Sequence, residues 1–105
     1  MKIDFDNPIH RAVVEDLREF GTLIKEARLR RDIPFSYLTE ETGLSRATLA
    51  RIERGDPGVS VASVFAVISV IKGNQKRLLD VVREPLCKSI EESVRHYPRK
   101  RSRRT

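Results

Sequence analysis

The stretch from residue 35 to residue 54, FSYLTEETGLSRATLARIER, constrains the fold more than any other part of this chain. It holds two short amphipathic segments separated by Gly43, which stands where the chain must reverse and where a left-handed conformation favours glycine. Ser45 then suits the N-cap of a new helix, because its hydroxyl can accept a hydrogen bond from an unpaired backbone N–H two or three residues later. The pattern predicts a helix over about residues 35–42, a turn, and a second helix over residues 46–53.

The two sides of the second helix differ in character. Leu49 and Ile52 fall on one side, which we expect to be buried. With about 100° between successive residues, the opposite side carries, within an arc of roughly 140°, Arg46, Ala47, Ala50, Arg51 and Arg54. An apolar back, an arginine-bearing front and small alanines are typical of a helix-turn-helix whose second helix enters the major groove of DNA. The alternative is an amphipathic helical hairpin whose arginines are merely solvated.

Helix start and stop signals divide the rest of the chain. Asn7-Pro8 is a start signal, a capping side chain followed by proline at the first helical position. From there to Arg31, apolar residues recur every three or four positions, as one long amphipathic helix or as two with a break near Gly21. The sequence RGDPG at residues 54–58 is the strongest turn signal in the chain.

The apolar segment of residues 61–72 has two readings. Its valines and isoleucines suit a strand. A capping residue at Ser60, the length of the segment and the closing Gly73 favour a buried helix instead. A last short helix is expected over residues 74–82.

Composition permits one small domain. The chain has 105 residues, of which 39% are hydrophobic and none is Trp, so the core must be mostly aliphatic. Cys87 is the only cysteine, which excludes an intramolecular disulfide and a cysteine-based metal site. No apolar run is long enough for a membrane span and the N-terminus lacks a signal-peptide pattern, so we expect a cytoplasmic protein, associated with the nucleoid when bound to DNA. His10, His96 and Cys87 accompany no catalytic set, and we expect neither enzymatic activity nor a metal or cofactor.

The net charge of +6 is concentrated at the C-terminus. The last eight residues, PRKRSRRT, contain no core residue and five basic ones: Arg99, Lys100, Arg101, Arg103 and Arg104. Such a segment is expected to be disordered and to hold DNA phosphates non-specifically, although a solubilising tail and contact with an acidic partner stay open. Before it, Leu86, Ile90, Val94 and Tyr97 recur at helical spacing, which predicts a helical extension over residues 85–97 docked on its own domain, its twin or a partner.

Residues 16–82 resemble the Xre/Cro family of lambda-repressor-like DNA-binding domains. The resemblance depends on the pattern FGxxIKxxR at residues 20–28, on RIERG at residues 51–55, and on the core and turn positions Leu38, Gly43, Leu49 and Ile52. It implies an all-α fold with a five-helix domain over residues 16–84, preceded at residues 1–15 by an N-terminal arm and the start of the first helix.

The same resemblance assigns the contact residues. Arg46, Ala47 and Arg51 stand where family members place base-contacting side chains, and an arginine can make a bidentate contact to O6 and N7 of guanine. The residues expected at phosphates, which position the protein without specifying sequence, are Ser45, Thr48, Arg54 and Ser36. Ser45 is expected to cap its helix as well.

Within the family, an arginine at the position of Arg28 pairs with a glutamate at that of Glu53, and we carry this over as a structural pair. The chain departs from the pattern at Pro34 and Phe35, where the family often has a polar cap and a glutamine. It departs again where Thr39 replaces a small residue and Thr42 replaces an aliphatic one.

Residues 55–60, GDPGVS, and the apolar helix after them resemble the HipB-type antitoxins. In these, a small Xre-type protein binds operator DNA as a homodimer, represses its own operon and holds a HipA-type kinase toxin. The resemblance implies an autoregulating repressor in a toxin-antitoxin system. The alternatives are a phage or mobile-element regulator without a toxin partner, and a protein-binding adaptor that has lost DNA binding.

A homodimer is also expected on geometric grounds, because one helix-turn-helix reads only about half a turn of DNA. Apolar residues of the 61–71 helix, with Leu78, Leu79, Val81 and Val82, can supply either the dimer seam or the core.

Overall fold

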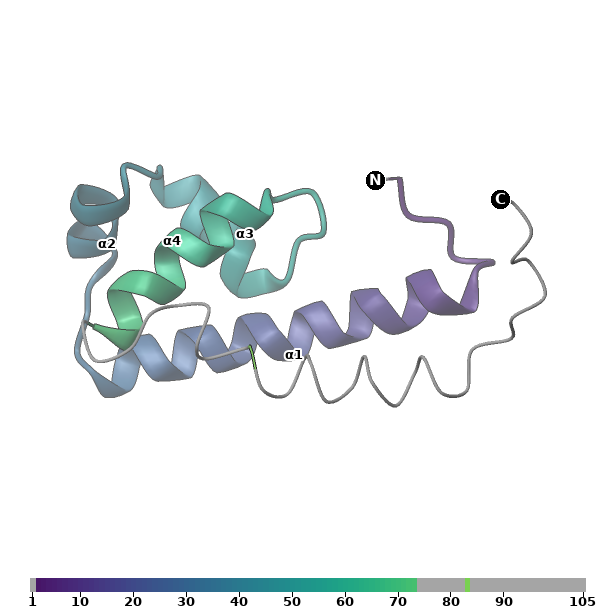
Figure 1. Cartoon of the computed structure of the whole chain (residues 1–105), viewed down its shortest axis with the longest axis horizontal. Helices are drawn as coiled ribbons and strands as arrows, with labels where there is room; N and C mark the ends of the chain where they lie inside the picture. The colour runs from purple at the N-terminus through teal and green to yellow at the C-terminus, as the bar shows by residue number, and fades with distance from the viewer. Residues whose placement is uncertain (1, 74–82, 84–105) are drawn as a thin grey trace. The chain divides into compact units, whose positions relative to one another are not determined.

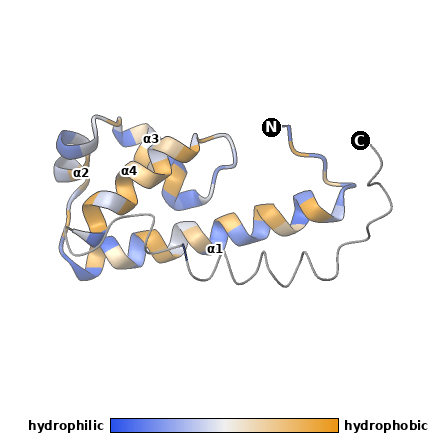
Figure 2. Ribbon diagram, in the orientation of Figure 1, coloured by the Kyte–Doolittle hydropathy of each residue, from blue (hydrophilic) through white to orange (hydrophobic). Residues whose placement is uncertain are grey.

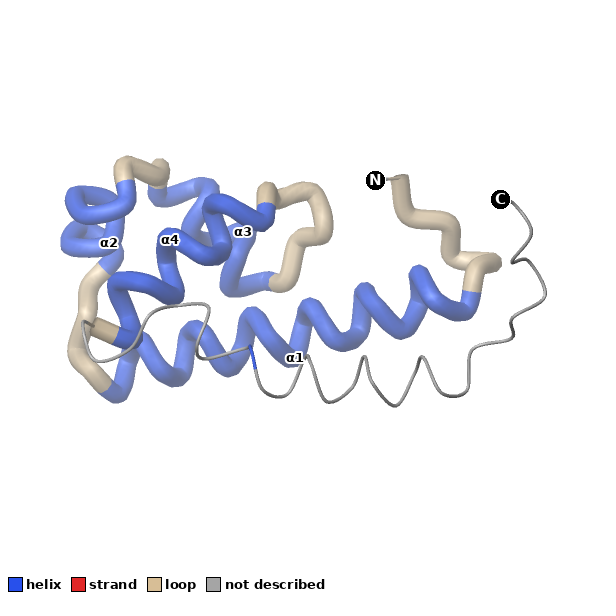
Figure 3. The backbone as a smooth tube through the Cα atoms, in the orientation of Figure 1, coloured by secondary structure: helices blue, strands red, loops and turns tan. Residues whose placement is uncertain are grey.

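The computed structural model describes residues 2–73 and Arg83. Within these residues there are four helices and no strand (Figures 1 and 3): α1 (Pro8–Arg30), α2 (Phe35–Thr42), α3 (Arg46–Arg54) and α4 (Val61–Lys72). The prediction of an all-helical fold is confirmed for this part of the chain. The helix expected over residues 74–82, the extension over 85–97 and the basic tail over 98–105 lie outside the described residues.

Helix α1 begins where the sequence predicts and runs without a break. The side chain of Asn7 accepts hydrogen bonds from the backbone N–H of Ile9 at 2.8 Å and of His10 at 3.3 Å, and Pro8 opens the helix. Gly21 lies inside the helix, so one long helix is the correct reading of the two. The chain then turns at Asp32, which adopts a positive φ of 54°.

The turn between α2 and α3 follows the predicted chemistry. Gly43 has φ of +78°, in the left-handed region, and its N–H donates to the carbonyl of Thr39. The hydroxyl of Ser45 accepts from the N–H of Thr48 at 3.1 Å and so caps α3. Helix α3 ends at Arg54, one residue beyond the predicted end, and Gly55 continues with φ of +78°.

Helix α4 resolves the strand-or-helix ambiguity in favour of the helix. The hydroxyl of Ser60 accepts from the N–H of Ser63 at 3.1 Å, and Gly73 follows the last helical residue with a positive φ. Figure 2 shows that α4 is largely hydrophobic, whereas polar and apolar residues alternate along α1. The buried residues of α4 are Val67 and Ile71.

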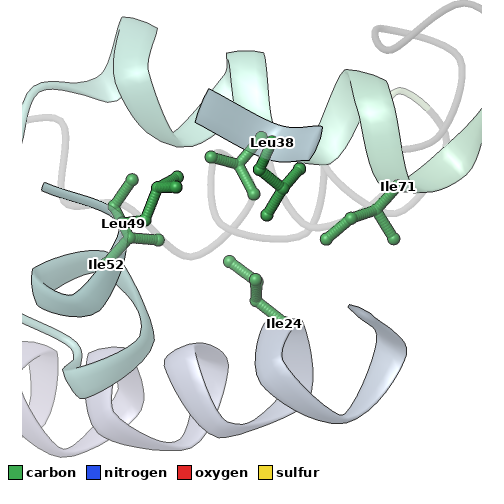
Figure 4. Close-up of a cluster of buried hydrophobic side chains, with 6 residues drawn as sticks. Ile24, Leu38, Leu49, Ile52 and Ile71 are labelled. Atoms are coloured by element: carbon green, nitrogen blue, oxygen red, sulfur yellow. The ribbon is translucent and has the colours of Figure 1, made fainter. Parts of the chain in front are cut away.

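Aliphatic side chains from all four helices form the core (Figure 4). Its buried members are Ile24, Leu38, Leu49, Ile52, Val67 and Ile71. Leu38 and Leu49 are 0% and 1% exposed, and burying a side chain of this size is worth about 1.5–3 kcal/mol. Helix α1 packs mainly against α3, while α2 packs against both α3 and α4. The apolar back of α3 therefore packs against both α1 and α2.

A glycine permits the close packing of α1 on α3. A Cβ atom at Gly21 would lie 2.6 Å from the carbonyl oxygen of Glu53 and 2.8 Å from that of Ile52. Both atoms belong to the backbone of α3, so no side-chain rotation could make room. Gly21 is thus required by the approach of the two helices, which fixes where α3 lies.

Two threonines that depart from the family pattern behave differently. The hydroxyl of Thr42 donates to the carbonyl of Leu38 at 2.6 Å and accepts from the N–H of Leu44 at 3.1 Å, so it closes the end of α2. The hydroxyl oxygen of Thr39 is buried and has no hydrogen-bond partner among the described residues. A buried hydroxyl without a partner is destabilising.

Candidate nucleic-acid interface

Helix α3 divides into a buried back and an exposed front. Leu49 and Ile52 lie in the core. On the other side Arg46, Ala47 and Arg54 are exposed, and the side chain of Arg51 is 41% exposed. The residues that the sequence predicts as base contacts therefore lie together on one accessible face.

At the start of α3, the hydroxyls of Ser45 and Thr48 are hydrogen-bonded to each other. Ser45 caps the helix through the N–H of Thr48, and its own hydroxyl donates to the hydroxyl oxygen of Thr48 at 3.1 Å. Ser45 is exposed and Thr48 is half-buried. The structural role expected for Ser45 is therefore present, and its oxygen stays at the accessible end of the helix, where the backbone dipole favours an anion.

Ser36 is exposed in the first turn of α2, which has no side-chain cap because Pro34 precedes it. It lines a shallow surface depression together with Asp32 and Glu40. Two carboxylates beside this serine oppose the approach of a phosphate. Of the predicted phosphate contacts, Ser36 therefore has the least favourable surroundings.

The pair that the family resemblance implies joins three elements. Arg28 Nε donates to Glu53 Oε2 at 2.7 Å and Nη2 donates to Oε1 at 3.2 Å, which links α1 to α3. Nη1 donates to the carbonyl of Ile33 at 3.0 Å, and the guanidinium lies 4.5 Å from the ring centroid of Phe35, at the start of α2. The two charged side chains are only 12% and 9% exposed. Each nitrogen of this guanidinium donates a hydrogen bond within the fold and the side chain is nearly buried, so Arg28 orients α3 and presents little surface to a ligand.

The role of Phe35 was not foreseen from the sequence. In the sequence it is only a departure from the pattern of the Xre/Cro family, which often has a glutamine near this position. In the structure its ring lies under the guanidinium of Arg28, an arrangement that cation–π attraction stabilises. The aromatic residue at the start of α2 therefore belongs to the support of α3.

A second ion pair involves a predicted contact residue and one that the sequence reasoning missed. Arg51 Nε donates to Asp56 Oδ2 at 2.9 Å. The other carboxylate oxygen, Oδ1, accepts from the N–H of Gly58 at 2.7 Å. The hydrogen bond from Arg51, and then that from Gly58, hold the pKa of Asp56 below its usual value. The Asp-Pro-Gly sequence after a helix predicts a turn, and it is also the signal that could have indicated such a carboxylate, because aspartate often accepts from the backbone two residues later.

The described residues offer no candidate metal site and no membrane-spanning helix. They contain no group of three or more His, Cys, Asp and Glu side chains that could hold a metal ion. Nδ1 of His10 accepts from the N–H of Asp4 at 2.9 Å and so holds the N-terminal arm against α1. None of the helices in this part of the chain is both long and apolar enough to cross a membrane. His96, Cys87 and the predicted basic contacts of the tail lie outside the described residues.

Comparison with protein-family models, with curated proteins and with solved structures finds no match to this chain.

Proposed function

We propose that this chain is a sequence-specific DNA-binding repressor whose helix α3 enters the major groove. The observation that carries the proposal is the arginine-bearing front of α3, which is exposed while its back is held in the core on both sides. A helix presented in this way can lie in a groove about 12 Å wide.

The face of α3 offers distinct contacts. Arg46 and Arg51 would each bind the O6 and N7 edge of a guanine, a contact worth about 1–3 kcal/mol of discrimination against another base. Ala47 would allow close approach or meet a thymine methyl group. Thr48 and Arg54 would bind phosphates, together with the N-terminal end of α3 at Ser45, and so set the register without reading sequence.

The regulatory role is proposed at a finer level. We infer that two copies bind two half-sites one helical turn apart, because one helix of this length spans only part of a site. The resemblance of residues 55–60 to HipB-type antitoxins supports an autoregulating repressor of a toxin-antitoxin operon, with a HipA-type kinase as the second partner. Exposed apolar side chains at Phe20, Val61 and Phe65 favour a further protein contact of this kind.

The proposal is tested with the DNA upstream of the gene for this chain. Fluorescence anisotropy compares that duplex with a scrambled duplex of equal length at two salt concentrations. The wild-type protein should prefer the upstream duplex, and its affinity should fall steeply with salt. The double substitution Arg46→Ala, Arg51→Ala should reduce the preference by about thirtyfold or more, because two bidentate contacts are lost.

A control pair carries the same change in net charge. Lys25 and Arg30 are exposed on α1, away from the front of α3. Lys25→Ala with Arg30→Ala should weaken binding to both duplexes equally and keep the preference. The free energy of unfolding of the α3 double variant should lie within about 1 kcal/mol of wild type, since the ion pair that it loses among the described residues, Arg51–Asp56, is half-exposed.

Either of two results would contradict the proposal. One is equal affinity of the wild-type protein for the two duplexes, which would favour the protein-binding adaptor. The other is an α3 double variant that keeps the preference, which would remove α3 as the reading helix.

A further inference from the structure

We propose that Asp56 is a positioning residue that holds the guanidinium of Arg51 in the orientation needed to read one base pair, and that it thereby determines specificity. This inference rests on the proposed function of α3. It concerns a residue outside the helix, in the loop that connects α3 to α4.

The carboxylate of Asp56 is itself held in place. Its Oδ1 atom accepts from the N–H of Gly58 at 2.7 Å, and its own backbone N–H donates to the carbonyl of Arg51 at 3.0 Å. Oδ2 is left to accept from Arg51 Nε at 2.9 Å. The loop therefore presents a fixed acceptor to the side chain of the arginine.

Gly58 has no side chain, and this leaves space for the Arg51–Asp56 pair beside it. A Cβ atom at this position would lie 3.2 Å from Arg51 Nη2 and 3.2 Å from Asp56 Oδ1, closer than most such contacts in proteins. A side chain here would press on both members of the pair. The absence of one lets the loop close against the guanidinium.

The arginine–carboxylate pairs of Arg28 and Arg51 use their donors differently. In Arg28 all three nitrogens donate to Glu53 or to the carbonyl of Ile33, and the side chain is 12% exposed. In Arg51 only Nε donates within the described residues, and the side chain is 41% exposed. Among the described residues no acceptor is hydrogen-bonded to Nη1 or Nη2 of Arg51, and this edge carries the paired donors that the O6 and N7 atoms of guanine accept.

A fixed acceptor at Nε favours binding because it orders the side chain of Arg51 before the DNA arrives. Less side-chain conformational entropy is then lost when Arg51 contacts a base. Immobilising one long side chain weakens binding by about three- to tenfold. A carboxylate that only closed the loop would have the opposite effect. It would compete with DNA for the guanidinium of Arg51, and removing it would strengthen specific binding. The two roles predict opposite signs.

The experiment uses duplexes that the wild-type protein selects from a random-sequence library, each then altered at one base pair at a time. The discrimination at each position is the ratio of dissociation constants for altered and selected duplexes. Asp56→Ala should lower discrimination about three- to tenfold at a single position. Arg51→Ala should lower it at the same position by about five- to hundredfold, and the double variant should match Arg51→Ala.

Further variants separate positioning from charge and from folding. Glu19→Ala removes one negative charge from an exposed position on α1 and should leave discrimination unchanged. Asp56→Asn keeps an amide oxygen for one of the two hydrogen bonds. Its discrimination at this position should therefore lie between that of wild type and that of Asp56→Ala. In the free protein, the NMR order parameter of Arg51 Nε should be high in wild type and should fall in Asp56→Ala while the thermal midpoint stays near that of wild type.

The outcomes are distinguishable. If the wild-type protein discriminates but Asp56→Ala keeps its discrimination or binds the selected duplex more tightly, the positioning role is overturned and the DNA-reading role of α3 stands. If the wild-type protein selects no sequence, the proposed function fails and this inference fails with it.

Discussion

Replacing Gly21 with alanine tests the packing that seats α3 in this fold. The added Cβ atom would meet three backbone atoms of α3, the nearest being the carbonyl oxygen of Glu53 at 2.6 Å. An ordinary carbon–oxygen contact is about 3.3–3.6 Å even when it is close. Helix α1 would therefore have to move away from α3 by several tenths of an ångström or more, and the core between them would lose contacts.

The expected loss of stability follows from two opposing effects. Overpacking of a core costs about 1–3 kcal/mol, and the upper end applies here because the opposing atoms belong to a helix backbone. Alanine gains about 0.8–1 kcal/mol over glycine inside a helix. The net destabilisation of Gly21→Ala is about 2 kcal/mol, which for a domain of this size lowers the melting temperature by roughly 8–16 °C.

Urea denaturation followed by far-ultraviolet circular dichroism measures this change, with two matched controls. Thr22→Ala, at the next and exposed position of α1, should change stability by less than about 0.5 kcal/mol. Gly43→Ala meets no atom within 4 Å but keeps φ of +78°, so it should cost about 1 kcal/mol from backbone strain alone. A Gly21→Ala variant as stable as wild type would refute the close approach of α1 and α3.

Two other predictions concern buried polar groups. Arg28→Met leaves the carboxylate of Glu53 buried without its partner and should destabilise the fold by about 3 kcal/mol. Adding Glu53→Leu to this variant should recover most of the lost stability, because the unpaired buried charge is removed. Equal stability of the single and double variants would contradict this prediction. Thr39→Ala removes a buried hydroxyl that has no hydrogen-bond partner among the described residues, and it should stabilise the fold by about 0.5–1 kcal/mol in chemical denaturation. Thr42→Ala breaks two hydrogen bonds and should destabilise the fold by about 1 kcal/mol. The reverse order of stabilities would show that the Thr39 hydroxyl is satisfied.

The helix boundaries could be predicted because they depend on local chemistry. Asn7, Ser45 and Ser60 each accept from a backbone N–H of the helix that follows, and Gly43 adopts a left-handed conformation. Each of these signals acts within a few residues of itself. The sequence alone is therefore sufficient to place them.

Features that depend on a distant partner could not be decided in the same way. Gly21 could break a helix or permit a close approach, and only the position of α3 distinguishes the two. The same holds for Phe35, whose ring meets a guanidinium from another helix. The sequence predicts the turn that contains Asp56, but it does not show that Oδ2 of this residue accepts from Arg51.

For the candidate site, the pattern of residues indicates the accessible face of α3 but not which of its arginines a loop carboxylate binds. In the helical pattern Arg46 and Arg51 lie at the two edges of the front, about 140° apart, and the pattern assigns the same kind of base contact to both. In the structure Arg51 is bound by a loop carboxylate, whereas Arg46 is exposed on the first turn of α3. Helical periodicity carries no information about a loop that follows the helix.

Methylation interference on the duplex bound by the wild-type protein is the experiment to carry out first. Guanine N7 lies in the major groove and is an acceptor for the arginine contact proposed for Arg46 and Arg51. Duplexes methylated at particular guanines should be depleted from the bound fraction, in two clusters about one helical turn apart. Arg46→Ala and Arg51→Ala should each relieve the interference at a different guanine. Equal methylation of the bound and free fractions at every guanine would contradict the reading of the major groove by α3.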